Sequence, residues 1–174
     1  MEPMRENHEP MFKDLVEIIT KELVLYESLL TILKDKQNAI ISGNIKNLRE
    51  NIREETNIVQ EVLTITAKRD NYVGILNQIL DISDQKPKLK TIIERSPSDY
   101  SVKLSNLRYQ LKNNLNQITI TNKENKYLLN SSIEQVRGMV NLFLSAENEP
   151  EEIYDVNGFM TARGAGNNVL NCQI

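Results

Sequence analysis

The feature that most constrains this chain is a heptad spacing of apolar residues that continues from Ile45 to Leu80. Its members are Ile45, Leu48, Ile52, Val59, Val62, Val73, Leu76 and Leu80, with polar Glu55, Thr66 and Arg69 at three further positions. Apolar residues that recur every three and four positions line one face of an α-helix, and a sustained repeat is typical of a coiled coil. The pattern predicts a long amphipathic helix over about residues 45–80.

A second stripe precedes this helix. It consists of Phe12, Leu15, Ile19, Tyr26, Leu29, Leu33 and Ile40, with polar Glu22 and Lys36 at the remaining steps, and it predicts a helix over about residues 10–42. Gly43-Asn44 then forms a helix stop and turn. Because two long amphipathic helices joined by a short turn pack side by side, we expect an antiparallel hairpin. The absence of Trp and an aromatic content of 5% disfavour β-sandwiches and barrels.

A third, longer helix is predicted over about residues 97–145. Its apolar stripe steps by four at Leu107, Leu111 and Leu115, which relaxes a coiled-coil twist locally. Before it, Pro87 interrupts the chain, and Leu89, Ile92 and Ile93 predict a short helix across the end of the hairpin. We therefore predict an all-α fold, a three-helix coiled-coil bundle within residues 1–146, followed by a flexible Gly- and Asn-rich tail over residues 147–174.

Two asparagines fall on the apolar stripe of the third helix. Asn122 and Asn125 lie three and four residues from apolar neighbours, which predicts that they occupy the helix seam. A buried seam asparagine lowers stability but fixes the register when it finds a partner. A register role is one interpretation, and a polar contact with a partner protein is the other.

The sequence carries no recognisable catalytic or metal site. His8 is the only histidine and Cys172 the only cysteine, and no Gly-rich phosphate loop, HExxH or CxxC spacing is present. We expect no enzymatic activity, no metal and no cofactor. Alternating acids and bases with a net charge of −3 argue against nucleic-acid binding. The single cysteine, the absence of an apolar run of roughly 18 residues, and a polar start favour the cytoplasm over a membrane or secretion.

The lengths of the predicted helices indicate a binding surface. At about 1.5 Å per residue, the first two helices are each about 50 Å long and the third about 75 Å. The excess of the third helix, about 20 Å, has no internal partner and is rich in apolar residues: Ile133, Val136, Met139, Val140, Leu142, Phe143 and Leu144. Such a stripe usually marks a protein interface. Alternatively, the helix breaks near Gly138 and folds back, or the stripe closes a homodimer.

Several motifs resemble the FlgN family of flagellar export chaperones. The stretch from Asn122 to Leu129 matches that family's N-x-x-N-x-x-L-L pattern. Tyr154-Asp155-Val156-Asn157-Gly158 is similar to its Y-G-x-x-G motif, with Asp155 in place of the first glycine, and Arg163-Gly164 follows. The resemblance covers most of the chain, and the order and spacing of these motifs make it more specific than any one of them alone.

The resemblance implies a cytoplasmic chaperone that binds hook-filament junction proteins, prevents their premature assembly and delivers them to the flagellar type III export gate. It implies substrate binding by Ile133, Val136, Met139, Val140 and Phe143, and docking on the gate's cytoplasmic domain by Tyr154 and Gly158. The expected state is a monomer or a weak homodimer, without nucleic acid or membrane insertion. The alternative is a structural or adaptor coiled coil that homodimerises firmly.

Overall fold

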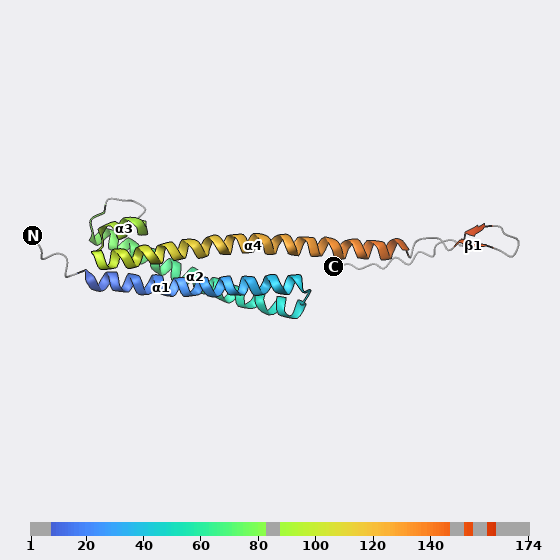
Figure 1. The fold of residues 1–174 in the computed structure, drawn as a ribbon, viewed down its shortest axis with the longest axis horizontal. Coiled ribbons are helices and arrows are strands. Elements are labelled where there is room, and N and C mark those ends of the chain that lie inside the picture. The colour runs from blue at the N-terminus through green and yellow to red at the C-terminus, as the bar shows by residue number, and fades with distance from the viewer. Residues whose placement is uncertain (1–7, 83–87, 147–151, 155–159, 163–174) are drawn as a thin grey trace, which may run out of the picture. The chain divides into compact units, whose positions relative to one another are not determined.

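The computed structural model describes residues 8–82, 88–146, 152–154 and 160–162. Its elements are α1 (Glu9–Ile41), α2 (Ile45–Ile79), α3 (Leu89–Arg95), α4 (Ser98–Ala146), β1 (Glu152–Tyr154) and β2 (Met160–Ala162) (Figure 1). The chain forms two compact units, Met1–Leu129 and Asn130–Ile174. The predicted all-α class, with an antiparallel hairpin and a long third helix, is confirmed.

The turn between α1 and α2 depends on its glycine and its asparagine. Gly43 has a φ of 63°, in the left-handed region where a Cβ is disfavoured. Asn44 caps α2, because its side-chain oxygen accepts a hydrogen bond from the backbone N–H of Asn47 at 3.1 Å. These two residues stop one helix, start the next and reverse the chain direction.

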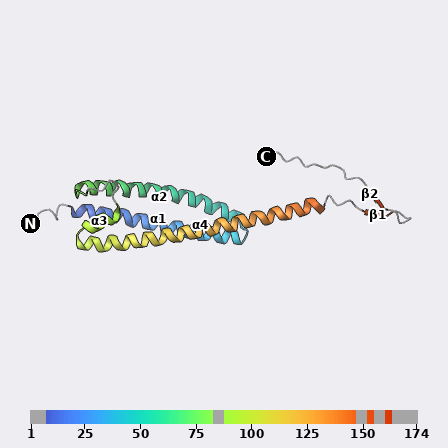
Figure 2. The same ribbon diagram turned by 90° about the horizontal axis from the view of Figure 1, so that it is seen from above.

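In the first unit, α4 runs parallel to α1. The rings of Phe12 and Tyr100 lie 6.0 Å apart, and Asn125 reaches the backbone of Leu33 farther along both helices. Figure 2 shows α1 with α2 on one side and α4 on the other. Helices α2 and α4 therefore both pack against α1.

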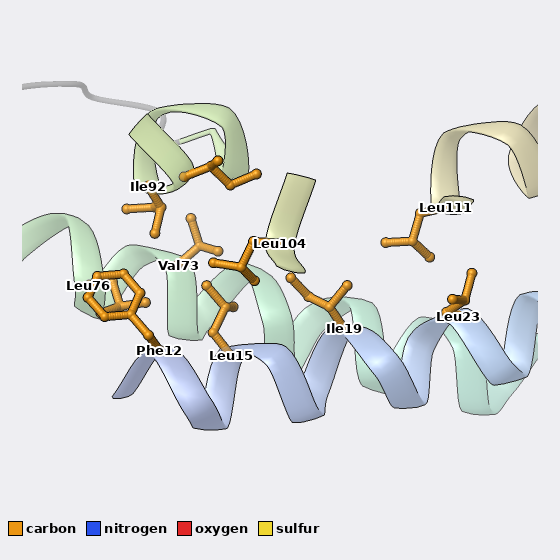
Figure 3. Packing of buried hydrophobic residues seen from close by; sticks show 10 residues of the cluster. Phe12, Leu15, Ile19, Leu23, Val73, Leu76, Ile92, Leu104 and Leu111 are labelled. Carbon is orange, nitrogen blue, oxygen red and sulfur yellow. The ribbon is translucent and has the colours of Figure 1, made fainter. Parts of the chain in front are cut away.

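The main core lies at the end of the bundle remote from the α1–α2 turn. Its buried residues come from all four helices, as Figure 3 shows: Phe12, Leu15, Ile19, Leu23, Val73, Leu76, Ile92, Ile93, Leu104 and Leu111. The short helix predicted around Ile92 is present as α3, and its two isoleucines close this end of the core. Packing of this kind is the largest favourable contribution to folding.

Nearer the α1–α2 turn the core is narrower. There Leu29, Leu30, Leu33 and Ile118 are buried, and α2 contributes only the partly buried Ile58 and Val59. Ile45 and Ile52, predicted to line the seam of α2, are 58% and 47% exposed. That part of the prediction is wrong, because the core at this end is formed mainly by α1 and α4.

Polar seam residues of α1 and α2 pair with one another. The Glu22 carboxylate is fully buried and accepts hydrogen bonds from Arg69 Nη1 at 2.7 and 2.8 Å and from Thr66 Oγ1 at 2.9 Å. Lys36 forms an ion pair with Glu55. The two pairs fix the same antiparallel register, because Lys36 follows Glu22 at the same spacing at which Arg69 follows Glu55.

The charged partners also set the titration of Arg69. Burial alone would lower the pKa of its guanidinium, but the hydrogen bond to Asp70 and the charges of Glu22 and Asp70 outweigh burial and raise the pKa. Arg69 is therefore a permanent cation facing a buried carboxylate.

Within the stretch expected to be a flexible tail, the structure describes a short antiparallel hairpin. β1 pairs with β2 in the register Glu152–Ala162, Ile153–Thr161 and Tyr154–Met160. Residues 147–151, 155–159 and 163–174 of the predicted tail lie outside the described part of the chain.

Candidate partner-binding face of helix α4

In the first unit, the seam of α4 follows a regular alternation of three and four residues. Leu104, Leu111, Ile118, Thr121 and Asn125 are buried, and Leu107 and Asn114 are half-buried between them. This spacing is that of an uninterrupted left-handed coiled coil.

Two sequence predictions for the seam are wrong. Leu115 is 42% exposed, and the half-buried Asn114 takes its place. Asn122 is exposed, and Thr121 takes its place. The reason is the same in both cases: a step of three rather than four keeps the seam turned toward α1 along the supercoil.

Asn125 lies in the α1–α4 interface, where it is 3% exposed. Its Nδ2 donates to the backbone oxygen of Leu33 at 2.8 Å, while its Oδ1 has no hydrogen-bond partner among the described residues. Beside it, Gln37 Nε2 donates to Glu124 Oε2 at 3.1 Å. These contacts pair one point of α4 with one turn of α1, so a register role for Asn125 remains a proposal with a geometric basis.

The predicted substrate-binding residues all lie on the second-unit part of α4. Their side chains are between 42% and 74% exposed: Ile133, Val136, Met139, Val140 and Phe143. We call these five residues the α4 face. The helix runs through Gly138 without a break as far as Ala146, so the alternative of a helix broken there is wrong.

The chemistry of the α4 face is almost purely apolar. Val136, Met139, Val140 and Phe143 stand at positions i, i+3, i+4 and i+7, which places them on one side of an α-helix. Between Asn130 and Ala146 the only charged residues are Glu134 and Arg137. A clustered apolar face of this kind fits another amphipathic helix and offers little to a polar small molecule.

The two residues predicted to dock on the export gate lie beyond α4. The backbone of Tyr154 ends β1 and pairs with Met160. Gly158 lies outside the described residues. The structure thus places Tyr154 at the last pair of a hairpin and leaves its predicted role as a proposal.

The described residues contain neither a metal-binding cluster nor a membrane-spanning helix. Among them, no group of three or more His, Cys, Asp or Glu side chains is arranged to hold a metal ion. None of the helices in the described part of the chain has the length and apolarity needed to cross a membrane.

Of the comparisons with known proteins, the one with protein families gives a match. No curated protein and no solved structure matches the chain. Residues 11–162 match the family described as FlgN protein, and the match includes α1 from Met11 onward, α2, α3, α4 and both strands. Since this covers most of the sequence, the chain belongs to the FlgN family of flagellar export chaperones.

Proposed function

We propose that this protein is a cytoplasmic type III export chaperone that binds hook-filament junction proteins, prevents their premature assembly and delivers them to the flagellar export gate. The observation that carries the proposal is the α4 face, where five apolar side chains are exposed on one continuous helix. Membership in the FlgN family supports the chaperone class. The identity of the substrate and of the gate is the part that experiment must test.

The α4 face has the geometry for binding an amphipathic helix. Anchors at i, i+3, i+4 and i+7 are the spacing by which such helices are recognised. In the proposed complex, a terminal helix of the junction protein lies along α4 and covers Val136, Val140 and Phe143. Covering that helix prevents it from packing with other junction subunits, which accounts for the block on assembly.

Because the α4 face carries little charge, we expect binding to depend mainly on apolar contact. Apolar burial supplies most of the affinity, at about 25 cal/mol per Å². Because Glu134 and Arg137 are the only charged residues between Asn130 and Ala146, added salt should change the affinity little. A specific complex typically buries about 800 Å² on each partner, so the junction protein must contact more of the chain than these five side chains.

The proposal is tested by placing charge on the α4 face. A Val136→Asp/Phe143→Asp variant should lose binding to a purified junction protein, because each aspartate would have to be desolvated in the complex. Both side chains are exposed in the free protein, so helicity measured by circular dichroism should be unchanged. Binding is measured by isothermal titration calorimetry.

A matched control uses the same charge change on the same helix. Gln135 and Asn141 are exposed polar residues of this segment, so Gln135→Asp/Asn141→Asp should bind almost as well as the unmodified chain. If both variants bind equally well, or lose binding equally, the assignment of the α4 face is wrong.

Gate docking is proposed for Tyr154 and Gly158, which come from the family motif. Tyr154→Ala should spare junction-protein binding, because the residue lies outside α4, and should weaken capture of the protein by the gate's cytoplasmic domain. A pull-down with that domain and quantitative blotting measures the effect. Equal recovery of the Tyr154→Ala and unmodified chains would remove this role.

The competing function is a structural or adaptor coiled coil. The same apolar exposure of the α4 face favours it, because a self-complementary face can close a two-fold dimer. Light scattering separates the two functions. A firm dimer that Val136→Asp/Phe143→Asp dissociates supports the structural role, and a monomer or weakly associating chain supports the chaperone.

A further inference from the structure

An open groove lies on the first unit, where α2, α3 and α4 meet. Its volume is about 370 Å³. It is lined by Arg69, Asp70 and Val73 of α2, by Lys88 and Leu89 at the start of α3, and by Arg108, Leu111, Lys112 and Leu115 of α4. We call it the basic groove. All of its residues belong to Met1–Leu129, so it is separate from the α4 face.

The rim of the basic groove carries uncompensated positive charge. Arg69 is occupied, because its Nη1 contacts Glu22 and its Nη2 contacts Asp70 at 2.9 Å. Lys88, Arg108 and Lys112 are exposed, and no ion pair joins any of them to another described residue. Two elements, the start of α3 and α4, thus bring three cations to one opening.

The floor of the basic groove is apolar. Val73 and Leu111 are buried beneath it, and Leu89 is half-buried at its side. Leu115 is 42% exposed and completes this floor. This leucine was expected in the seam, and the structure instead turns it toward the groove, where it offers contact area that no helix of the first unit covers.

We propose that the basic groove binds an acidic segment of a partner protein, with carboxylates on the rim and one aliphatic or aromatic side chain on the floor. The charge is complementary to carboxylates, and the floor around Leu115 has the apolar character that recurs in binding pockets. A single-stranded or duplex nucleic acid requires a longer run of basic residues, and the chain as a whole has a net charge of −3. Binding to an anionic membrane surface typically uses clusters of about four to eight basic residues, and the rim offers the three cations Lys88, Arg108 and Lys112.

The proposal is tested with the full chain and a defined probe. The probe is a short fluorescein-labelled peptide of alternating glutamate and leucine, and fluorescence anisotropy measures its affinity. The variant Arg108→Glu/Lys112→Glu should weaken binding about tenfold or more, because it replaces two attractive charges with two repulsive ones. Lys123→Glu/Lys126→Glu makes the same change in net charge at exposed positions of the same helix and should change the affinity less than about twofold.

The floor is tested separately from the rim. Leu115→Ala should weaken binding of the peptide several-fold, because contact area with its leucines is lost. Val102→Ala, at another exposed position of α4, should leave the affinity unchanged. Circular dichroism establishes that each variant keeps the helicity of the unmodified chain.

Three results would overturn the proposal. One is equal weakening by the groove and control charge reversals, which would indicate attraction by net charge alone. The second is undiminished binding in Leu115→Ala. The third is tighter binding of single-stranded RNA, or of vesicles containing phosphatidylserine, than of the peptide, with the same dependence on Arg108 and Lys112. The Val136→Asp/Phe143→Asp variant should retain the peptide, so failure of this proposal is distinguishable from failure of the proposed chaperone function.

Discussion

The buried ion pair between Glu22 and Arg69 gives the sharpest prediction about stability. The Glu22 side chain is 0% exposed and that of Arg69 is 22% exposed. Arg69→Met removes the cation and leaves the Glu22 carboxylate with Thr66 as its remaining hydrogen-bond donor among the described side chains. Breaking a buried pair in this way typically costs 3–5 kcal/mol, and because water can partly reach the site of Arg69, we expect about 3 kcal/mol. Replacing both partners in Glu22→Leu/Arg69→Met removes the uncompensated charge and should restore most of that loss.

The measurement is urea unfolding followed by far-UV circular dichroism, since the chain contains no Trp. The control is the exposed ion pair of Lys90 and Glu94. Lys90 Nζ lies 3.6 Å from Glu94 Oε1, and the two side chains are 68% and 60% exposed. Lys90→Met should cost less than about 1 kcal/mol. The reasoning is refuted if Arg69→Met costs no more than Lys90→Met, or if the double variant is as unstable as the two single losses added together.

Two further predictions concern polar groups in the first unit. Asn125→Leu should leave the free energy of unfolding unchanged or raise it by about 1 kcal/mol. The reason is that it removes a buried oxygen, Asn125 Oδ1, that has no hydrogen-bond partner among the described residues. A loss of more than about 2 kcal/mol, measured by urea unfolding, would contradict this. Burial of Tyr72, and then its hydrogen bond to Asp14 at 3.0 Å, raise the pKa of its phenol from 10.0 to about 12. Since the folded-state pKa is the higher one, the stabilisation from Tyr72 is fully present below pH 10.0 and is lost as the pH rises toward about 12. Tyr72→Phe should reduce the decline of stability across that range in a series of urea titrations, and an identical decline would show that the phenol is not its source.

The features that the sequence predicted are those that short-range patterns determine. The apolar period of residues 45–80 defines α2, and Gly43-Asn44 defines the turn, because helix periodicity and turn chemistry are properties of neighbouring residues. Ile92 and Ile93 likewise indicated α3. Polar Glu22 and Arg69 were both visible as seam residues. Their pairing was not, because it depends on the long-range register of two helices.

The seam positions of α4 and the basic groove could not be predicted, because both depend on how separate helices pack together. At Leu115 and Asn122 the choice between a step of three and a step of four depends on the supercoil of α4 against α1, which the apolar pattern leaves ambiguous. The basic groove is lined by Lys88 at the start of α3 and by Arg108 and Lys112 of α4. Because these residues are far apart in the sequence, no local motif predicts the groove. The exposure of the α4 face was anticipated from helix length, because a helix longer than its partners must leave part of its stripe uncovered.

The central claim is that the α4 face binds the junction protein, and methyl NMR tests it most directly. Methyl resonances of Ile133, Val136, Met139 and Val140 are followed while unlabelled junction protein is added, with buried Ile19 and Ile92 of the first unit as internal references. We predict that the four α4 methyl groups shift or broaden in proportion to complex formation while the two reference isoleucines stay in place. Complex formation that leaves the α4 resonances unchanged would contradict the claim.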